Sequence, residues 1–211
     1  MSEVLPAAAA AAPLAKRLSA RAIILIELAL ALGGFAIGTG EFSIMGLMPN
    51  VAADLGITEP QVGNVISTYA LGVVVGAPLL AILGSRLPRR TLLLVLMAIF
   101  AIGNLATALS PDYHSMMLFR FFAGLPHGAY FGVAMLVAAS LAPPHKRAKA
   151  VSRVMLGLTV AILVGNPLAT WMGQVATWRY AFALVALIAL STVAMVAPRA
   201  WVGHRCGVTG V

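Results

Sequence analysis

One basic residue of this chain lies inside an apolar segment. Arg120 has hydrophobic sequence on both sides in the run from 119 to 132, FRFFAGLPHGAYFG. A charge that far from water costs free energy unless it has a partner or a function. Arg120 therefore indicates a site within the segment, with one alternative: an arginine close to a helix end can extend its side chain to the membrane interface.

A carboxylate stands at a comparable depth in another apolar segment. Glu41 precedes Pro49 by about eight residues, and Arg120 follows the start of its segment by about five, so at ~1.5 Å per residue the depths are similar. A buried Glu41–Arg120 ion pair is geometrically allowed. A Glu41 that exchanges partners between two conformations could load and release a proton, and the alternative is a static structural pair.

His127 follows Arg120 by about seven residues, roughly two helical turns, so both lie on about the same face. It could join a proton relay, or it could serve packing and hydrogen bonding alone. Glu27 is close to the start of its segment and is expected to reach the interface. The uncharged polar residues of the apolar segments either line a cavity or join helices; they include Asn64, Tyr69, Asn104 and Asn166.

Signatures of enzymes and of metal sites are missing from the sequence. It contains no G-x-S-x-G elbow, no H-E-x-x-H pair and no phosphate-binding glycine loop. Cys206 is the one cysteine, so the chain offers neither a disulfide framework nor a thiolate metal site. We therefore expect no enzymatic activity, no catalytic residue, no metal and no cofactor.

The composition is that of an integral membrane protein. Hydrophobic residues make up 61% of the 211 residues, charged residues 9%, and the mean hydropathy is +0.99, whereas soluble domains carry about 25% charged residues. This length holds at most about six or seven spans of ~20 residues. The net charge of +8 does not indicate nucleic acid, because the basic residues form short clusters between apolar runs, as in cytoplasmic membrane loops.

Six apolar segments are each long enough to cross a bilayer as a helix. They cover about 22–48, 62–83, 91–109, 115–141, 150–173 and 180–198. Residues 1–21 and 199–211 are interpreted as tails flanking a bundle at 22–198. The N-terminal tail is no secretory signal, because its positive charges follow the apolar run instead of preceding it.

The charges of the loops predict the orientation. If the chain crosses six times, most basic residues fall on one side, and the other side receives Arg179 with Asp54, Glu59 and Asp112. The positive-inside rule then places both termini in the cytoplasm. The basic side holds Lys16, Arg17, Arg21, Arg86, Arg89, Arg90, Lys146, Arg147, Lys149, Arg153, Arg199 and Arg205.

A weak internal repeat relates the two halves of the bundle. VGAPL at 75–79 matches VGNPL at 164–168, and the same offset pairs Arg90 with Arg179. The second segment runs inward while the fifth runs outward, so the repeated units would be inverted, as in many transporters; the alternative is chance similarity of two glycine-rich helices. Small residues at spacings of four predict close helix packing. Three prolines are expected to break the helices and allow bending: Pro78, Pro126 and Pro167.

Four stretches resemble motifs of one family. They are GAPLLAILGSRLPRR at 76–90, RFFAGLPHG at 120–128, GNPLATWMGQ at 165–174 followed by Trp-Arg at 178–179, and GTGEFSIMGLMPNVAADLGIT at 38–58. Their order and spacing resemble the N-terminal half of the major facilitator superfamily, in the drug:proton antiporter branch that holds sugar-efflux and chloramphenicol-resistance exporters. The implied fold is all-α: six transmembrane helices as two inverted three-helix repeats.

The resemblance implies secondary transport of a small-molecule substrate by alternating access, with proton antiport, in the inner (plasma) membrane. It gives Glu41 and Arg120, with His127 beside them, roles in proton coupling. It also implies a cytoplasmic gate built on Gly76, Arg86, Arg89 and Arg90, and a bending motif built on Gly165, Pro167 and Gly173. Two positions depart from the family pattern. Ser85 stands where the loop motif has an acid, and Pro88 stands where it has a glycine, so the gate is expected to be latched differently.

Family members resemble two such halves with the substrate held between them, and this chain matches the first half. Its final stretch, RAWVGHRCGVTGV, neither starts a seventh span nor continues convincingly as a loop. Three hypotheses follow. The chain is a truncated or frameshifted product whose C-terminal half is missing, a half-transporter that works as a homodimer, or a membrane remnant or scaffold without transport activity. The substrate itself, a drug or a sugar, does not follow from this half.

Overall fold

The computed structural model describes residues 19–197. It confirms six helical segments long and apolar enough to cross a membrane. The first ends at Leu55 instead of about 48 and the fifth begins at Pro144 instead of about 150, while the other bounds lie within three residues of those expected. The tails assigned to 1–21 and 199–211 lie outside the described residues, apart from 19–21. The spans are Arg21–Leu55, Glu59–Gly84, Arg89–Ala108, Tyr113–Leu141, Pro144–Val175 and Trp178–Val196.

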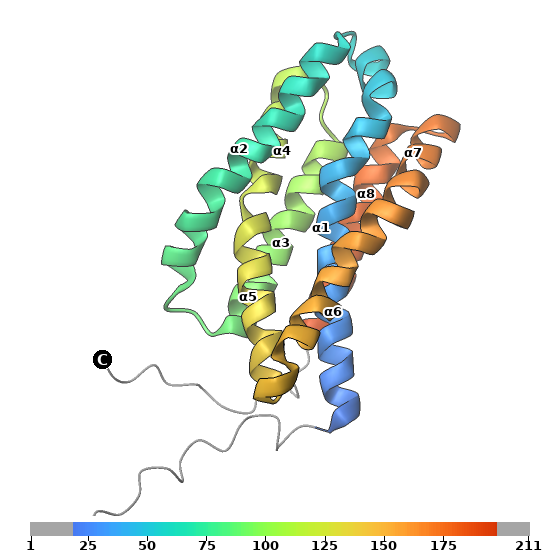
Figure 1. Cartoon of the computed structure of the whole chain (residues 1–211). Helices are drawn as coiled ribbons and strands as arrows, with labels where there is room; N and C mark the ends of the chain where they lie inside the picture. The colour runs from blue at the N-terminus through green and yellow to red at the C-terminus, as the bar shows by residue number, and fades with distance from the viewer. Residues whose placement is uncertain (1–18, 198–211) are drawn as a thin grey trace, which may run out of the picture.

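Four of the spans are single helices, and two are interrupted (Figure 1). The continuous ones are α1 (Ala20–Leu55), α2 (Glu59–Gly84), α3 (Arg89–Ala108) and α8 (Trp178–Val196). The fourth span divides into α4 (Tyr113–Gly124) and α5 (Pro126–Leu141). The fifth comprises η3 (Pro144–Lys146), α6 (Arg147–Val160), a π-helical turn η4 (Ala161–Gly165) and α7 (Asn166–Val175).

The first helix does not stop at Pro49, as its sequence predicts, but continues to Leu55. Both Pro49 and Met45, whose carbonyl loses its hydrogen bond to the proline, lie on the exposed side of the helix, so the interior packing is kept. The helix ends instead at Gly56. There the backbone takes the left-handed conformation with φ 63°, and the Gly56 and Ile57 N–H groups both donate to the carbonyl of Ala52.

The three prolines expected to break helices behave differently from one another. The expectation is wrong for Pro78, because α2 passes through it without interruption. Pro126 opens α5 directly after the helix break at Leu125. Pro167 stands at the start of α7, just after the π-helical turn of η4. Such turns are rare and are frequently found at functional sites.

The packing follows the inverted repeat. The middle span of the first unit, α2, packs on the first span of the second unit, α4 and α5, while the middle span of the second unit, α6 and α7, packs on α1. Glycines make both contacts close. A Cβ on Gly72 would clash with the backbone carbonyl of Phe121, and one on Gly157 would clash with that of Ala31. The third spans, α3 and α8, pack on each other and complete the core.

The third spans also cap one another's ends. Arg90, at the start of α3, donates from Nε to the carbonyl of Val196 at 3.2 Å and from Nη2 to the carbonyl of Ala197, at the end of α8. Arg179, at the start of α8, donates from Nη1 to the carbonyls of Ala108 (3.1 Å) and Ser110 (2.6 Å), at the end of α3. The two arginines paired by the sequence repeat therefore have equivalent roles.

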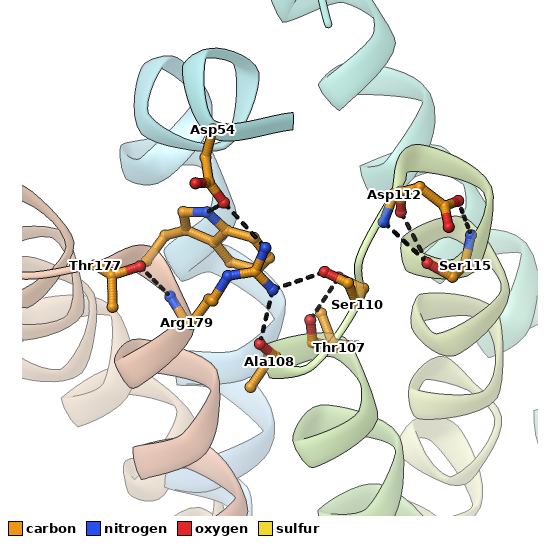
Figure 2. Close-up of polar contacts among 9 residues, drawn as sticks. Asp54, Thr107, Ala108, Ser110, Asp112, Ser115, Thr177 and Arg179 are labelled. Carbon is orange, nitrogen blue, oxygen red and sulfur yellow. Dashed lines mark hydrogen bonds and ion pairs between the residues drawn. The ribbon is translucent and has the colours of Figure 1, made fainter. Parts of the chain in front are cut away.

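Figure 2 shows that the contacts around Arg179 also reach α1. Nη2 of Arg179 donates to Oδ2 of Asp54 at 3.0 Å, and the indole Nε1 of Trp178 donates to the same oxygen at 2.9 Å. The guanidinium lies 4.4 Å from the centroid of the Trp178 ring. Arg179 thus joins the ends of three spans.

The charges divide the bundle into two ends, as the sequence predicts. We call the end that holds the starts of α1 and α3 and the loop before α6 the basic end; in Figure 1 it is the lower one. Glu27 lies there but does not extend freely to the interface, since its side chain is buried and Arg153 Nη1 donates to its Oε2 at 2.8 Å. The pair joins α1 to α6.

Candidate functional site

Arg120, on α4, is fully buried, which rules out the interface alternative. Its Nη1 donates to the backbone carbonyl of Gly40 on α1 at 2.8 Å. Its guanidinium carbon lies 4.2 Å from the ring centroid of Tyr69 and 5.3 Å from that of Phe182. Nε and Nη2 have no acceptor among the described residues. A buried guanidinium with unused donors can take another acceptor without breaking an existing bond.

The expected ion pair between Glu41 and Arg120 is not formed among the described side chains. The depth estimate was correct, because Arg120 reaches the residue beside Glu41. The pairing was wrong, because Gly40 faces the interior of the bundle while Glu41 lies on a partly exposed stripe of α1. Glu41 instead approaches His127 of α5, with 3.7 Å between Oε2 and Nδ1.

Tyr69 of α2 connects the two halves of this cluster. Its hydroxyl lies 3.1 Å from Nδ1 of His127, and its ring lies under the guanidinium of Arg120. The hydroxyl and the Glu41 carboxylate therefore approach the same nitrogen. Nδ1 accepts from the tyrosine when it carries no proton, and it can donate to the carboxylate when it carries one. The cluster of Glu41, Tyr69, Arg120 and His127 unites α1, α2, α4 and α5.

The residues assigned to the gate motif are not gathered in one place. Gly76 lies within α2, where a Cβ would clash with the carbonyl of Leu125 at the break in the fourth span. Arg86 is in the turn after α2 and Arg89 begins α3; both are exposed and have no ion pair with a described residue. Arg90 donates to the carbonyl of Val196 at the end of α8.

The residues assigned to bending lie along the seam between α1 and the fifth span. Gly165 ends the π-helical turn against Thr39, and Gly173 packs against Leu47 while its carbonyl accepts from Asn50 Nδ2 at 3.3 Å. Beside Pro167 a groove of about 700 Å³ opens between the two spans. It is lined by Phe42, Met45, Gly46, Ile162, Asn166, Pro167, Thr170, Trp171 and Gln174.

The other polar residues take separate positions. Asn104 donates to the carbonyl of Phe100 in its own helix, and Asn64 donates to the hydroxyl of Tyr113 at 3.3 Å. The sequence placed Tyr69 in this undecided group, and its spacing carries no signal for the contact with His127. Within residues 19–197, no three metal-binding side chains gather at one place.

Comparisons with known proteins agree with the fold and with the motifs. A model of the Major Facilitator Superfamily matches residues 30–204. The inner membrane transport protein YdhP of Escherichia coli K12 is 48% identical over 169 residues, which are 80% of this chain and 43% of that protein. The chloramphenicol resistance protein of Streptomyces lividans is 37% identical over 165 residues, covering 76% of this chain and 41% of that protein.

Among solved structures, the proton:xylose symporter XylE bound to a bromodeoxyglucose is similar over 85% of this chain and 45% of its own, with a TM-score of 0.76 and 20% identity. At that identity the likeness shows the fold. The chain spans less than half the length of the relatives it matches. It corresponds to the N-terminal half of the matched fold.

Proposed function

This chain belongs to the Major Facilitator Superfamily, and from that membership we propose that it forms half of a proton-coupled efflux transporter for a small molecule, a drug or a sugar. The observation that carries the coupling is the sharing of one histidine nitrogen. Glu41 and Tyr69 both approach Nδ1 of His127, beside a buried arginine with unused donors. Such a site has two arrangements of one proton.

In the first arrangement, Nδ1 carries no proton and accepts from the Tyr69 hydroxyl. In the second arrangement, Nδ1 carries a proton and donates it to the Glu41 carboxylate, so the Tyr69 hydroxyl loses Nδ1 as an acceptor. When the proton leaves, the carboxylate becomes free to turn toward the unused nitrogens of Arg120. The four residues of the cluster lie on α1, α2, α4 and α5, so a change of arrangement shifts contacts between four helices, which is what alternating access requires.

The remaining assignments are part of the same proposal. Arg86 and Arg89 act at the gate on the basic end, which faces the cytoplasm, and Gly165, Pro167 and Gly173 allow the fifth span to bend. The protein lies in the inner membrane, as its relative YdhP does by name. The second half of the transporter comes either from a second copy or from further sequence.

The test is transport by the purified chain in lipid vesicles. A proton gradient is imposed, and efflux of chloramphenicol and of a pentose is followed for the wild type and for Arg120→Ala, Glu41→Gln and Glu59→Gln. We expect gradient-driven efflux that both site variants lower by at least tenfold. Glu59, exposed at the start of α2, is the matched carboxylate control.

Transport that neither site variant changes would contradict the coupling. The alternative is a membrane scaffold without transport. Absence of efflux by a folded wild-type chain, also when it is dimeric, would support that reading.

A further inference from the structure

The basic end has more cations than carboxylates to pair with them. Between residues 19 and 197, Glu27 is the one carboxylate at this end, and it already binds Arg153. Arg90 is used by the carbonyls that end α8. The other cations of this end are exposed and have no carboxylate from the described chain; they are Arg21, Arg86, Arg89, Lys146, Arg147 and Lys149.

The turn at 85–88, which carries Arg86 and precedes Arg89, contains no carboxylate. Ser85 stands beside Arg86, and its hydroxyl donates to the carbonyl of Ile82 at 2.7 Å. Arg89 is the first residue of a helix long and apolar enough to cross a membrane, and the ends of such helices meet the lipid headgroups. An anion that pairs with it there would have to come from outside this part of the chain.

An apolar groove of about 310 Å³ opens next to Arg89, between α2, α3 and α5. Small residues form much of its wall, among them Ala81 and Gly84 on α2 and Gly132 on α5, while Leu92 of α3 also lines it. A Cβ on Gly132 would have no other atom within 4 Å, so the groove is open at that point. Arg89 and Ser85 are its polar lining residues.

We propose that this groove is a binding site for an anionic phospholipid, with one acyl chain along the small residues and the phosphate on Arg89. Arginine binds phosphate through paired N–H donors, and basic pockets between membrane helices on the side of the anionic leaflet bind such headgroups. The apolar wall of the groove contacts the acyl chain, and the exposed Leu87 and Leu136 extend this wall toward the bilayer. A packed helix would fill the groove but leave Arg89 without an anion.

The experiment counts lipids on the purified 211-residue chain by native mass spectrometry and follows thermal unfolding during titration. Phosphatidylglycerol and phosphatidylcholine with the same acyl chains are compared. We expect phosphatidylglycerol to bind preferentially and to raise the unfolding temperature. Arg89→Gln should weaken this binding about tenfold, as expected for a charge-assisted contact. Gly132→Leu, which fills the open point, should weaken it as well without lowering the unfolding temperature of the lipid-free chain.

Arg147→Gln is the matched control, because Arg147 is an exposed arginine at the same end that does not line the groove. The proposal is overturned if both lipids bind equally, or if Arg147→Gln weakens binding as much as Arg89→Gln does. Competition by inorganic phosphate that equals the lipid would assign a free-phosphate site instead. If Gly132→Leu abolishes a dimer but does not reduce lipid binding, the groove is the interface with a second copy. Either this result or the competition by phosphate would contradict a lipid site.

Discussion

Arg120 is the most costly residue of the bundle to bury, and it shares its surroundings with three other helices. Gly40 of α1 accepts one of its hydrogen bonds, and the rings of Tyr69 on α2 and Phe182 on α8 pack around its guanidinium. Two nitrogens stay without an acceptor. In a static structural ion pair both nitrogens would have an acceptor. Their lack of one therefore supports the proposal that Arg120 changes partners during transport.

Tyr69→Phe tests the shared histidine nitrogen, because it removes the hydroxyl but keeps the ring under Arg120. The hydroxyl stabilises the arrangement in which Nδ1 of His127 accepts a hydrogen bond. Without it this arrangement loses about 1 kcal/mol, so proton-driven efflux should fall by roughly fivefold. Efflux from vesicles under a fixed proton gradient measures the change.

Tyr180→Phe serves as the control for that measurement, since Tyr180 is exposed on α8. Efflux by Tyr69→Phe that equals efflux by Tyr180→Phe would show that the tyrosine does not compete for the nitrogen.

Asp112 allows a prediction outside the spans. It caps α4, and its pKa lies below the ordinary value of 3.8, first because its carboxylate accepts from the backbone N–H of Ser115, at 3.0 Å (Figure 2). A lowered folded-state pKa means that ionisation stabilises the fold above pH 3.8 and that this contribution is lost as the pH falls through the folded value. Asp112→Ala should unfold at a lower temperature than the wild type at pH 7, with a smaller difference at pH 3.

Asp112→Asn is the matched variant, because an asparagine retains the cap without the charge. Thermal unfolding of the three proteins in detergent provides the comparison. A difference between Asp112→Ala and the wild type that stays constant from pH 7 to pH 3 would contradict the assignment.

The sequence predicted which residues are unusual but not which of them touch. The depth of Arg120 followed from its distance to the segment end, and its burial from the cost of a charge in lipid. The partner of Glu41 did not follow, because it depends on how α1 is rotated about its axis. A rotation by one residue, about 100°, separates Gly40, which faces Arg120, from Glu41, which faces His127. Helical periodicity alone does not determine this rotation in a segment that is apolar all round.

At the scale of helices, α3 and α8 behave as one unit. Each contributes an arginine from its first turn to the carbonyls that end the other. Unused carbonyls at a helix end carry partial negative charge, so a guanidinium there both satisfies them and complements the helix dipole. The offset between Arg90 and Arg179 in the repeat was visible in the sequence. Their acceptors were not, since these depend on how the antiparallel pair is aligned.

Arg179→Gln should therefore lower the free energy of unfolding by about 1–2 kcal/mol, and Arg90→Gln by a similar or smaller amount. The larger effect is expected at Arg179 because it also binds Asp54. Chemical denaturation in mixed micelles measures both, with Arg147→Gln as the exposed control. Equal stability of Arg179→Gln and the control would contradict the capping.

The glycine contacts give a second prediction at this scale. Gly157→Ala should destabilise the fold by about 1–3 kcal/mol, since the added methyl would overlap the carbonyl of Ala31 and push α6 away from α1. Gly63→Ala is the matched control, because nothing lies within 4 Å of its Cβ position. It should be neutral or stabilising by up to about 1 kcal/mol, following helix propensity. Equal effects of both substitutions in the same denaturation assay would show that the α1–α6 contact is not close.

For the whole molecule, the orientation in the membrane stays a prediction, and the chain carries its own probe for it. Cys206 is the one cysteine and belongs to the C-terminal tail. With both termini in the cytoplasm, a membrane-impermeant maleimide should label Cys206 in inside-out vesicles and leave it unlabelled in intact cells. Cys206→Ser is the control for background labelling. Labelling in intact cells would reverse the assignment of the basic end.

The reciprocal contacts of α3 and α8 also determine an order of assembly. Arg90 is synthesised 106 residues before its acceptor Val196, and Ala108 is synthesised 71 residues before its donor Arg179. Until the sixth span is made, the guanidinium of Arg90 at one end of the third span therefore has no acceptor, and the carbonyl of Ala108 at the other end has no donor. Both are satisfied only when the sixth span inserts. The sixth span is thus the helix that completes both ends of this bundle.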